Sequence, residues 1–157
     1  ISSGLVGSEM CIRDRTIRQI YRSELSCQLI GGMPSGVERK SKWIKDWKKL
    51  YPLLEPCRTT LCFNWLDETA TTSRYVEALA IGIVPMVWRS YDVNNTYVID
   101  DWQRVKTFEE FETKAMMLRD DKFHEERLEI ARKNYAKVHL SEEGYYKEFE
   151  RMMNDAI

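Results

Sequence analysis

The sequence predicts an α/β fold in which a small parallel sheet is followed by a helical C-terminal part. Three observations lead to this prediction. Before residue 100, short apolar or β-branched runs alternate with amphipathic stretches, as in strands joined by crossover helices. After it, apolar residues recur at helical spacing. The 157 residues, 43% hydrophobic and 31% charged, suit one globular domain or a part of one.

Three good strands are expected, at residues 25–32, 58–65 and 83–88. The first ends in paired glycines before a turn-rich loop, and the second is rich in β-branched and aromatic residues. A turn at 91–95 then leads to a short fourth strand at 96–99. Because three good strands are few for a doubly wound sheet, we expect further strands to belong before the start of this chain.

Helices are expected between and after these strands. An amphipathic helix around residues 43–51 is expected to end or kink at Pro52, and a second helix at 74–81 is stopped by Gly82. Thr107 and Glu110 predict a capping box at the next helix start. Its apolar face and those of two later helical runs are formed by Phe108, Phe111, Ala115 and Leu118, by Leu128, Ala131, Tyr135 and Val138, and by Tyr145, Phe149 and Met152.

Charge and cysteine content exclude several classes of protein. The formal net charge of −1 gives no general attraction to nucleic acid or anionic membrane, and no run reaches the roughly 18 apolar residues of a membrane span. The cysteines show no C-x-x-C pair and no histidine at metal-ligand spacing. We therefore expect a cytoplasmic protein without a metal site. The cysteines are Cys11 and Cys27, and the pair expected as buried free thiols, Cys57 and Cys62.

A candidate anion site lies at the start of the predicted helix at 74–81. Ligands of parallel α/β sheets bind beyond the carboxyl ends of the strands. Thr71, Thr72 and Ser73 occupy the strand-to-helix loop there, where free backbone N–H groups favour an anion such as phosphate. Since Thr and Ser are also preferred N-caps, plain capping is the alternative interpretation.

Glu77 is the second candidate, because a helix places it on one face with Ser73 and Arg74. One interpretation is a surface ion pair with Arg74, which contributes a few tenths of a kcal/mol. The other is a carboxylate just behind the anion site that accepts hydrogen bonds from a pair of sugar hydroxyls. The spacing alone is compatible with both.

Other side chains at the strand ends are expected either to line a cleft or to pack in the core. They are Asn64, Trp65, Trp88, Tyr91 and Asp92. The two histidines, His124 and His139, belong to the helical tail, and we expect both at the surface.

The stretch TSRYVEALAIGIVPMVW, residues 72–88, resembles the C-terminal, nucleotide-sugar-binding domain of glycosyltransferases of the GT-B architecture. There a Glu-Ala-Leu/Met-Ala helix passes through a glycine into a V-P-V/I-V-like strand. The resemblance covers residues 58–88, and the helical tail is similar in kind only. It implies a partial Rossmann-like sheet that is truncated at its N-terminal side.

The resemblance also implies roles for individual residues. Glu77 would bind the nucleotide ribose, and the diphosphate would lie at the helix start, on Ala70, Thr71, Thr72 and Ser73. Many members of the family carry another Glu where this chain has Thr69, beside Glu68, so the donor-sugar contact departs from the family pattern. The remaining donor-site candidates are Thr69, Asn64, Gly31, Gly32 and Arg39. By their location, Arg39, Lys40 and Lys42 are candidates for neutralising the diphosphate, and a solvated charge run is the alternative interpretation.

The expected function is thus that of a glycosyltransferase fragment, which binds a nucleotide-diphosphate sugar without a cofactor or an essential metal. The family's acceptor site and catalytic base belong to an N-terminal domain, so the fragment is expected to be inactive alone. The acceptor is left open between a surface glycan and, with weaker support from the interrupted lysine-rich segment 39–49, DNA. The alternatives are a non-catalytic α/β interaction module and another nucleotide-sugar enzyme such as an epimerase.

The first fifteen residues stand apart from the rest. The stretch LVGSEMCIRDR resembles one reading frame of a transposase mosaic-end sequencing adapter. The resemblance implies that residues 1–15 are not native, and that residues 16–157 are a fragment of the donor-binding domain. For residues 1–15 we expect neither a helical nor a strand period, and no specific packing.

Overall fold

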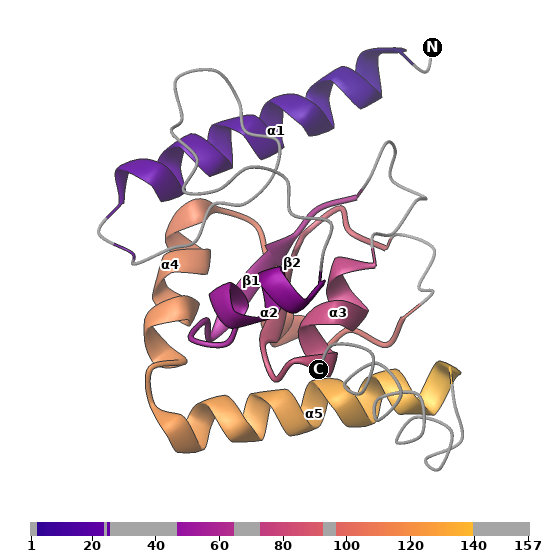
Figure 1. Cartoon of the computed structure of the whole chain (residues 1–157). Coiled ribbons are helices and arrows are strands. Elements are labelled where there is room, and N and C mark those ends of the chain that lie inside the picture. Colours follow the sequence, from indigo (N-terminus) through magenta and orange to yellow (C-terminus); the bar gives the residue numbers. More distant parts are fainter. Residues whose placement is uncertain (1–2, 24, 26–46, 65–72, 93–96, 140–157) are drawn as a thin grey trace. The chain divides into compact units, whose positions relative to one another are not determined.

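The computed structural model describes residues 3–23, 25, 47–64, 73–92 and 97–139, with the backbone alone for 3–12, 47, 138 and 139. It divides into two compact units, Ile1–Cys57 and Arg58–Ile157 (Figure 1). The predicted strand at 25–32 lies outside the described residues, apart from Leu25.

In the first unit, the helix α1 (Ser3–Arg22) includes most of the stretch that resembles an adapter. The absence of a helical period in residues 1–15 therefore did not exclude a helix over residues 3–15. An α-helix makes its hydrogen bonds within one segment, so good helix formers such as Leu, Glu, Met and Arg suffice without a regular apolar period. The non-native origin of these residues stays a prediction.

The second helix of this unit, α2 (Trp47–Leu54), contains Pro52. The helix ends two residues beyond the proline, close to the end predicted from it. Leu50, from the predicted apolar face, is buried, with 8% of its surface exposed. Residues 43–46, expected to begin this helix, lie outside the described part of the chain.

The second unit contains a parallel sheet in the order β1 (Thr59–Cys62), β2 (Val84–Trp88) and β3 (Arg104–Val105). The predicted parallel α/β class is confirmed, and β1 and β2 lie within the predicted strands. The third described strand, however, is not at 96–99. Residues 97–99 are irregular, and the backbone N–H of Tyr97 is taken by the carboxylate of Asp92 at 2.7 Å instead of a neighbouring strand.

Pro85 occupies the central strand of this sheet, although proline lacks the N–H that a sheet ladder needs. The adjacent Val84 directs its backbone toward β1, since its N–H donates to the carbonyl of Arg58 at 3.1 Å. Neighbouring residues of a strand alternate in direction, so Pro85 faces the β3 side, where β3 pairs only from Val87 onward. There the buried amide of Gln103 donates to the Pro85 carbonyl at 2.7 Å. A side chain thus replaces the missing strand partner.

The crossover from β1 to β2 contains α3 (Arg74–Ala80), as predicted. Gly82 follows with φ +83°, a conformation that glycine adopts readily and that ends the helix. Both α3 and the long helix α5 (Asp121–His139) pack against β2 and against each other (Figure 1). The core cluster of buried residues between them consists of Cys62, Tyr75, Leu79, Val87, Tyr91 and Ala131.

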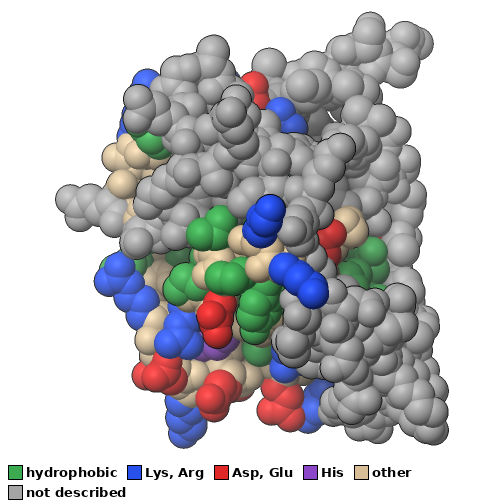
Figure 2. All heavy atoms as spheres, in the orientation of Figure 1, with side chains coloured by type: hydrophobic (Ala, Val, Ile, Leu, Met, Phe, Trp, Pro, Cys, Tyr) green, Lys and Arg blue, Asp and Glu red, His purple; other side chains and the backbone are tan. Residues whose placement is uncertain are grey.

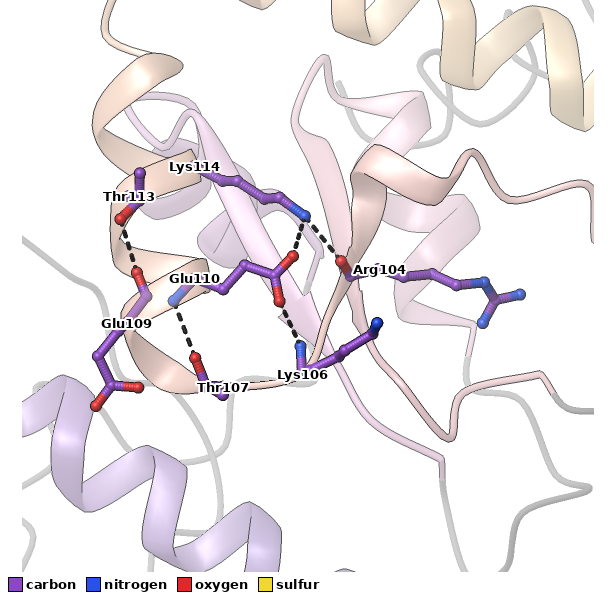
Figure 3. A network of polar contacts seen from close by, with 7 residues as sticks. All are labelled: Arg104, Lys106, Thr107, Glu109, Glu110, Thr113 and Lys114. Atoms are coloured by element: carbon purple, nitrogen blue, oxygen red, sulfur yellow. Dashed lines mark hydrogen bonds and ion pairs between the residues drawn. The ribbon is translucent and has the colours of Figure 1, made fainter.

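A polar network joins β3 to the helix α4 (Phe108–Met117) (Figure 3). The hydroxyl of Thr107 accepts the N–H of Glu110 at 3.2 Å, which confirms the predicted N-cap. The carboxylate of Glu110 accepts the N–H of Lys106 at 2.9 Å, one residue before the position of a standard capping box. Lys114 donates to the other carboxylate oxygen at 2.6 Å and to the carbonyl of Arg104 at 2.8 Å, so one lysine ties the helix to the strand.

Candidate functional site

The candidate site lies where β1 and β2 end and α3 begins. Of the residues predicted to bind the donor, the structure describes Asn64, Ser73 and Glu77. The others lie outside the described residues, and their predicted roles stay predictions. These are Gly31, Gly32, Arg39, Thr69, Ala70, Thr71 and Thr72, together with Lys40, Lys42, Trp65 and Glu68.

Glu77 lies in the first turn of α3, and 26% of its side chain is exposed. The hydroxyl of Ser73 donates to one carboxylate oxygen at 2.6 Å, and the guanidinium of Arg74 pairs with the other oxygen. The predicted common face of these three residues is therefore real. The carboxylate is held at both oxygens at the start of the helix that follows β1.

Ser73 does not act as the conventional cap that was the alternative interpretation. It occupies the N-cap position of α3, but its side chain makes no hydrogen bond to the first backbone N–H groups of the helix. Its hydroxyl is directed to Glu77 instead. The surface ion pair of Arg74 with Glu77, which was one of the two interpretations of Glu77, is present. Arg74 is half exposed, with 54% of its side chain accessible.

Asn64, two residues after β1, is 8% exposed and does not present its amide to solvent. Its nitrogen donates to the carbonyl of Ser90 at 2.7 Å, and its oxygen accepts the N–H of Asp92 at 3.3 Å. Both ends of the amide thus bind the backbone that follows β2. Asn64 joins the ends of two parallel strands, which is a positioning role and differs from the predicted direct contact with a ligand.

The aromatic residues at the end of β2 and just after it belong to the core. Trp88 is 8% exposed and stacks on Phe63 with ring centroids 5.8 Å apart. Tyr91 is fully buried and stacks on Tyr75 at 6.3 Å. Of the two expectations for this region, packing is confirmed for Trp88 and Tyr91.

Asp92, the next residue, is 1% exposed and has φ +55°, which is uncommon for a residue with a side chain. Its carboxylate accepts the N–H of Tyr97 at 2.7 Å, so Asp92, like Asn64, positions the backbone that follows β2. Tyr97 stacks on Tyr75 at 5.1 Å and contacts Tyr135 of α5 at 5.9 Å. Tyr97, which the Asp92 carboxylate holds, therefore packs on tyrosines of α3 and α5.

Arg104 is a residue at this edge that the sequence did not reveal. Its guanidinium reaches from β3 and donates to the carbonyl of Tyr91 at 2.9 Å. Together with Asn64 it holds the turn after β2 from both neighbouring strands. The signal for Arg104 would have been a strand at 104–105, but a two-residue strand carries no readable period.

His124 contradicts the expectation that the histidines lie at the surface. It is 7% exposed, and its Nε2 lies 3.2 Å from the carbonyl oxygen of Arg58, just before β1. Burial lowers the pKa of this imidazole, and the nearby guanidinium of Arg58 adds to the effect. His139 is in α5, but its side chain lies outside the described part.

Within the described ranges, no group of three His, Cys, Asp or Glu side chains is placed to hold a metal ion. In the same ranges, no helix combines the length and the apolar character that a bilayer crossing requires. Acidic and basic side chains of the described part lie intermixed on the face in Figure 2.

Comparisons with protein-family models, with curated proteins and with solved structures give no match to this chain.

Proposed function

We propose that this chain is the nucleotide-sugar-binding part of a glycosyltransferase of the GT-B architecture. One observation carries the proposal. Glu77, the residue to which the resemblance assigns ribose binding, lies in the first turn of the helix that joins two parallel strands, with Ser73 and Arg74 on its carboxylate.

The position of this carboxylate supports the proposal. Parallel sheets bind ligands beyond the carboxyl ends of their strands, and α3 begins at that edge, after β1. The side chain of Glu77 is 26% exposed, and a carboxylate can accept two hydrogen bonds from vicinal hydroxyls such as those of a nucleotide ribose. Ser73 and Arg74 restrict its rotamer before a ligand arrives, which lowers the entropic cost of binding.

In the proposed reaction, a sugar passes from a nucleoside diphosphate to an acceptor, and the diphosphate leaves with developing negative charge. Backbone N–H groups at the start of a helix stabilise such charge. The proposal assigns this task to residues 70–73, of which Ser73 is described and exposed. The acceptor and the catalytic base are assigned to a domain outside this chain, so the proposed activity of the chain itself is binding.

The test is calorimetric titration of the 157-residue chain with uridine, guanosine, adenosine and thymidine diphosphates. One of them is expected to bind, and Glu77→Ala is expected to weaken that binding by at least about 10- to 100-fold, since even one hydrogen bond to a charged group contributes about 1.5–3 kcal/mol. Glu77→Gln keeps one acceptor oxygen and is expected to lie between the two.

The control is Glu109→Ala, which removes an exposed carboxylate from the first turn of another helix, α4. It is expected to bind as the unmodified chain does. Equal affinity of the Glu77→Ala variant and the unmodified chain, or no binding of any of the four nucleotides, contradicts the proposal. Circular dichroism of each variant shows whether the fold is retained.

A further inference from the structure

A group of cationic side chains lies at the carboxyl end of β2 and β3. Arg104 belongs to β3 and Lys106 directly follows it, and Figure 3 shows both side chains on one side of the strand, away from Glu110. The backbone N–H of Arg89 donates to the carbonyl of Val105 at 2.9 Å, so the ladder between the two strands continues just beyond the end of β2. Arg89 and Lys106 are exposed. These cations share the edge at which parallel sheets bind ligands.

Arg104 carries its charge toward the candidate site. Its backbone pairs with Val87 inside the ladder, but its guanidinium reaches the carbonyl of Tyr91 at 2.9 Å, in the turn that follows β2. That bond uses one of several N–H groups of a guanidinium. The preceding carbonyl, of Ser90, accepts the amide of Asn64 at 2.7 Å. The charge of Arg104 therefore lies beside the backbone that joins the ends of β1 and β2.

The first turn of α3 reaches the same part of the sheet. The hydroxyl of Tyr75 accepts the amide of Gln103 at 3.4 Å, and Gln103 directly precedes Arg104. Glu77, to which the proposed function assigns the ribose, lies in that turn of α3. The cations of β2 and β3 thus belong to the same edge of the sheet as the proposed ribose carboxylate.

The acidic side chains near these cations are bound by other groups. Glu110 accepts from Lys114 and from the backbone N–H of Lys106, and the buried Asp92 holds a backbone N–H of its own loop. Within the described part of the chain, the side chains of Arg89 and Lys106 form no hydrogen bond or ion pair. Cations gathered without counter-charges attract an anionic ligand.

We propose that Arg89, Arg104 and Lys106 bind the diphosphate of the nucleotide-sugar donor, an inference that rests on the proposed function and names the cations of its diphosphate site. Guanidinium and ammonium groups bind phosphate oxygens through charge-assisted hydrogen bonds. Arg104 is held in place by the Tyr91 carbonyl before a ligand arrives, which lowers the entropic cost of binding. The same positive charges stabilise the diphosphate as it leaves the sugar.

The probe is inorganic diphosphate, which carries the charge of the donor but has no ribose. In calorimetric titration of the 157-residue chain, it is expected to bind, and the double variant Arg89→Gln/Lys106→Gln is expected to bind it about tenfold more weakly. The matched control is Arg119→Gln/Lys122→Gln, which removes the same charge from exposed positions at the end of α4 and the start of α5. It is expected to bind as the unmodified chain does, and so is Arg89→Lys/Lys106→Arg, which keeps both charges.

Glu77→Ala separates this inference from the proposed function. It is expected to weaken the binding of the nucleoside diphosphate but not that of inorganic diphosphate. No binding of inorganic diphosphate overturns the inference, as does equal affinity of the Arg89→Gln/Lys106→Gln variant and the unmodified chain, or an equal loss in the matched control. If the double variant does not fold, the NMR amide signals of residues 89–92 and 104–106 in the unmodified chain decide. They are expected to shift on addition of inorganic diphosphate more than those of α4, and an equal shift overturns the inference.

Discussion

The side-chain oxygen of Asn64 accepts the backbone N–H of Asp92 at 3.3 Å, across 28 residues of sequence. The nitrogen of the same amide donates to Ser90 at 2.7 Å. Asp92 in turn has φ +55° and holds the N–H of Tyr97 on its carboxylate. One buried amide at the end of β1 therefore fixes the path of the chain that leaves β2, including a residue in a conformation it would rarely adopt alone.

We expect Asn64→Ala to destabilise the chain by about 1–3 kcal/mol, because two hydrogen bonds of a buried amide are lost. The measurement is urea unfolding followed by circular dichroism, with the midpoint falling at unchanged slope. The matched control is Asn134→Ala, since the amide oxygen of Asn134 accepts an exposed bond from Lys137 at 3.2 Å within α5. Equal effects of the two substitutions would contradict the role assigned to Asn64.

The best-predicted part of the fold is the segment from β1 through α3 to β2. Its signals are local: β-branched residues at 59–60, a helical stretch, and Gly82 at the point where the chain needs a positive φ. Helix and strand patterns of this kind are set by neighbours in sequence, so one chain suffices to detect them. The Thr107 cap was predictable for the same reason.

The features that escaped prediction depend on contacts between distant residues. The stretch at 97–99 has strand-forming residues, yet Asp92 takes the N–H of Tyr97 and the sheet continues only at Arg104. His124 is buried, and its ring contacts a carbonyl 66 residues away. No pattern in the immediate sequence of either residue encodes such a partner, and tertiary contacts override local preference in both cases.

For the candidate site, the sequence predicted the common face of Ser73, Arg74 and Glu77 but not what each side chain does there. Helical spacing fixes which residues are neighbours. It does not decide whether the serine hydroxyl caps the backbone or binds the glutamate, because both acceptors lie within its reach. Asn64 was predicted within the strand and lies two residues beyond it, and its partners follow β2, so they were not predictable from β1.

Arg132 of α5 is expected to stabilise α3 from its C-terminal end. Its Nε and Nη2 donate to the carbonyl of Leu79 at 3.1 and 2.8 Å, and a cation is favourable at the negative end of a helix. Arg132→Met keeps the aliphatic part of the side chain but removes both bonds, so we expect a loss of about 1–2 kcal/mol in the free energy of unfolding. The adjacent Lys133 is the control, because its pair with Glu129 is largely exposed, and Lys133→Met is expected to change stability by less than about 0.5 kcal/mol. A Lys133→Met effect as large as that of Arg132→Met would refute the assignment.

Cys62 is expected to resist alkylation for as long as the chain is folded. The thiol is 2% exposed, and burial raises its pKa to about 12, with Arg74 opposing the shift and Glu77 adding to it. At about pH 8 the reactive thiolate is then roughly one part in ten thousand, and the reagent has little access to it.

Cys57 is the internal comparison, since it is only half-buried. After iodoacetamide treatment, peptide mass mapping should find Cys57 modified in the native chain and Cys62 modified only in urea. Modification of both thiols at the same rate under native conditions would show that the core around β1 opens far more readily than the packing of Cys62 implies.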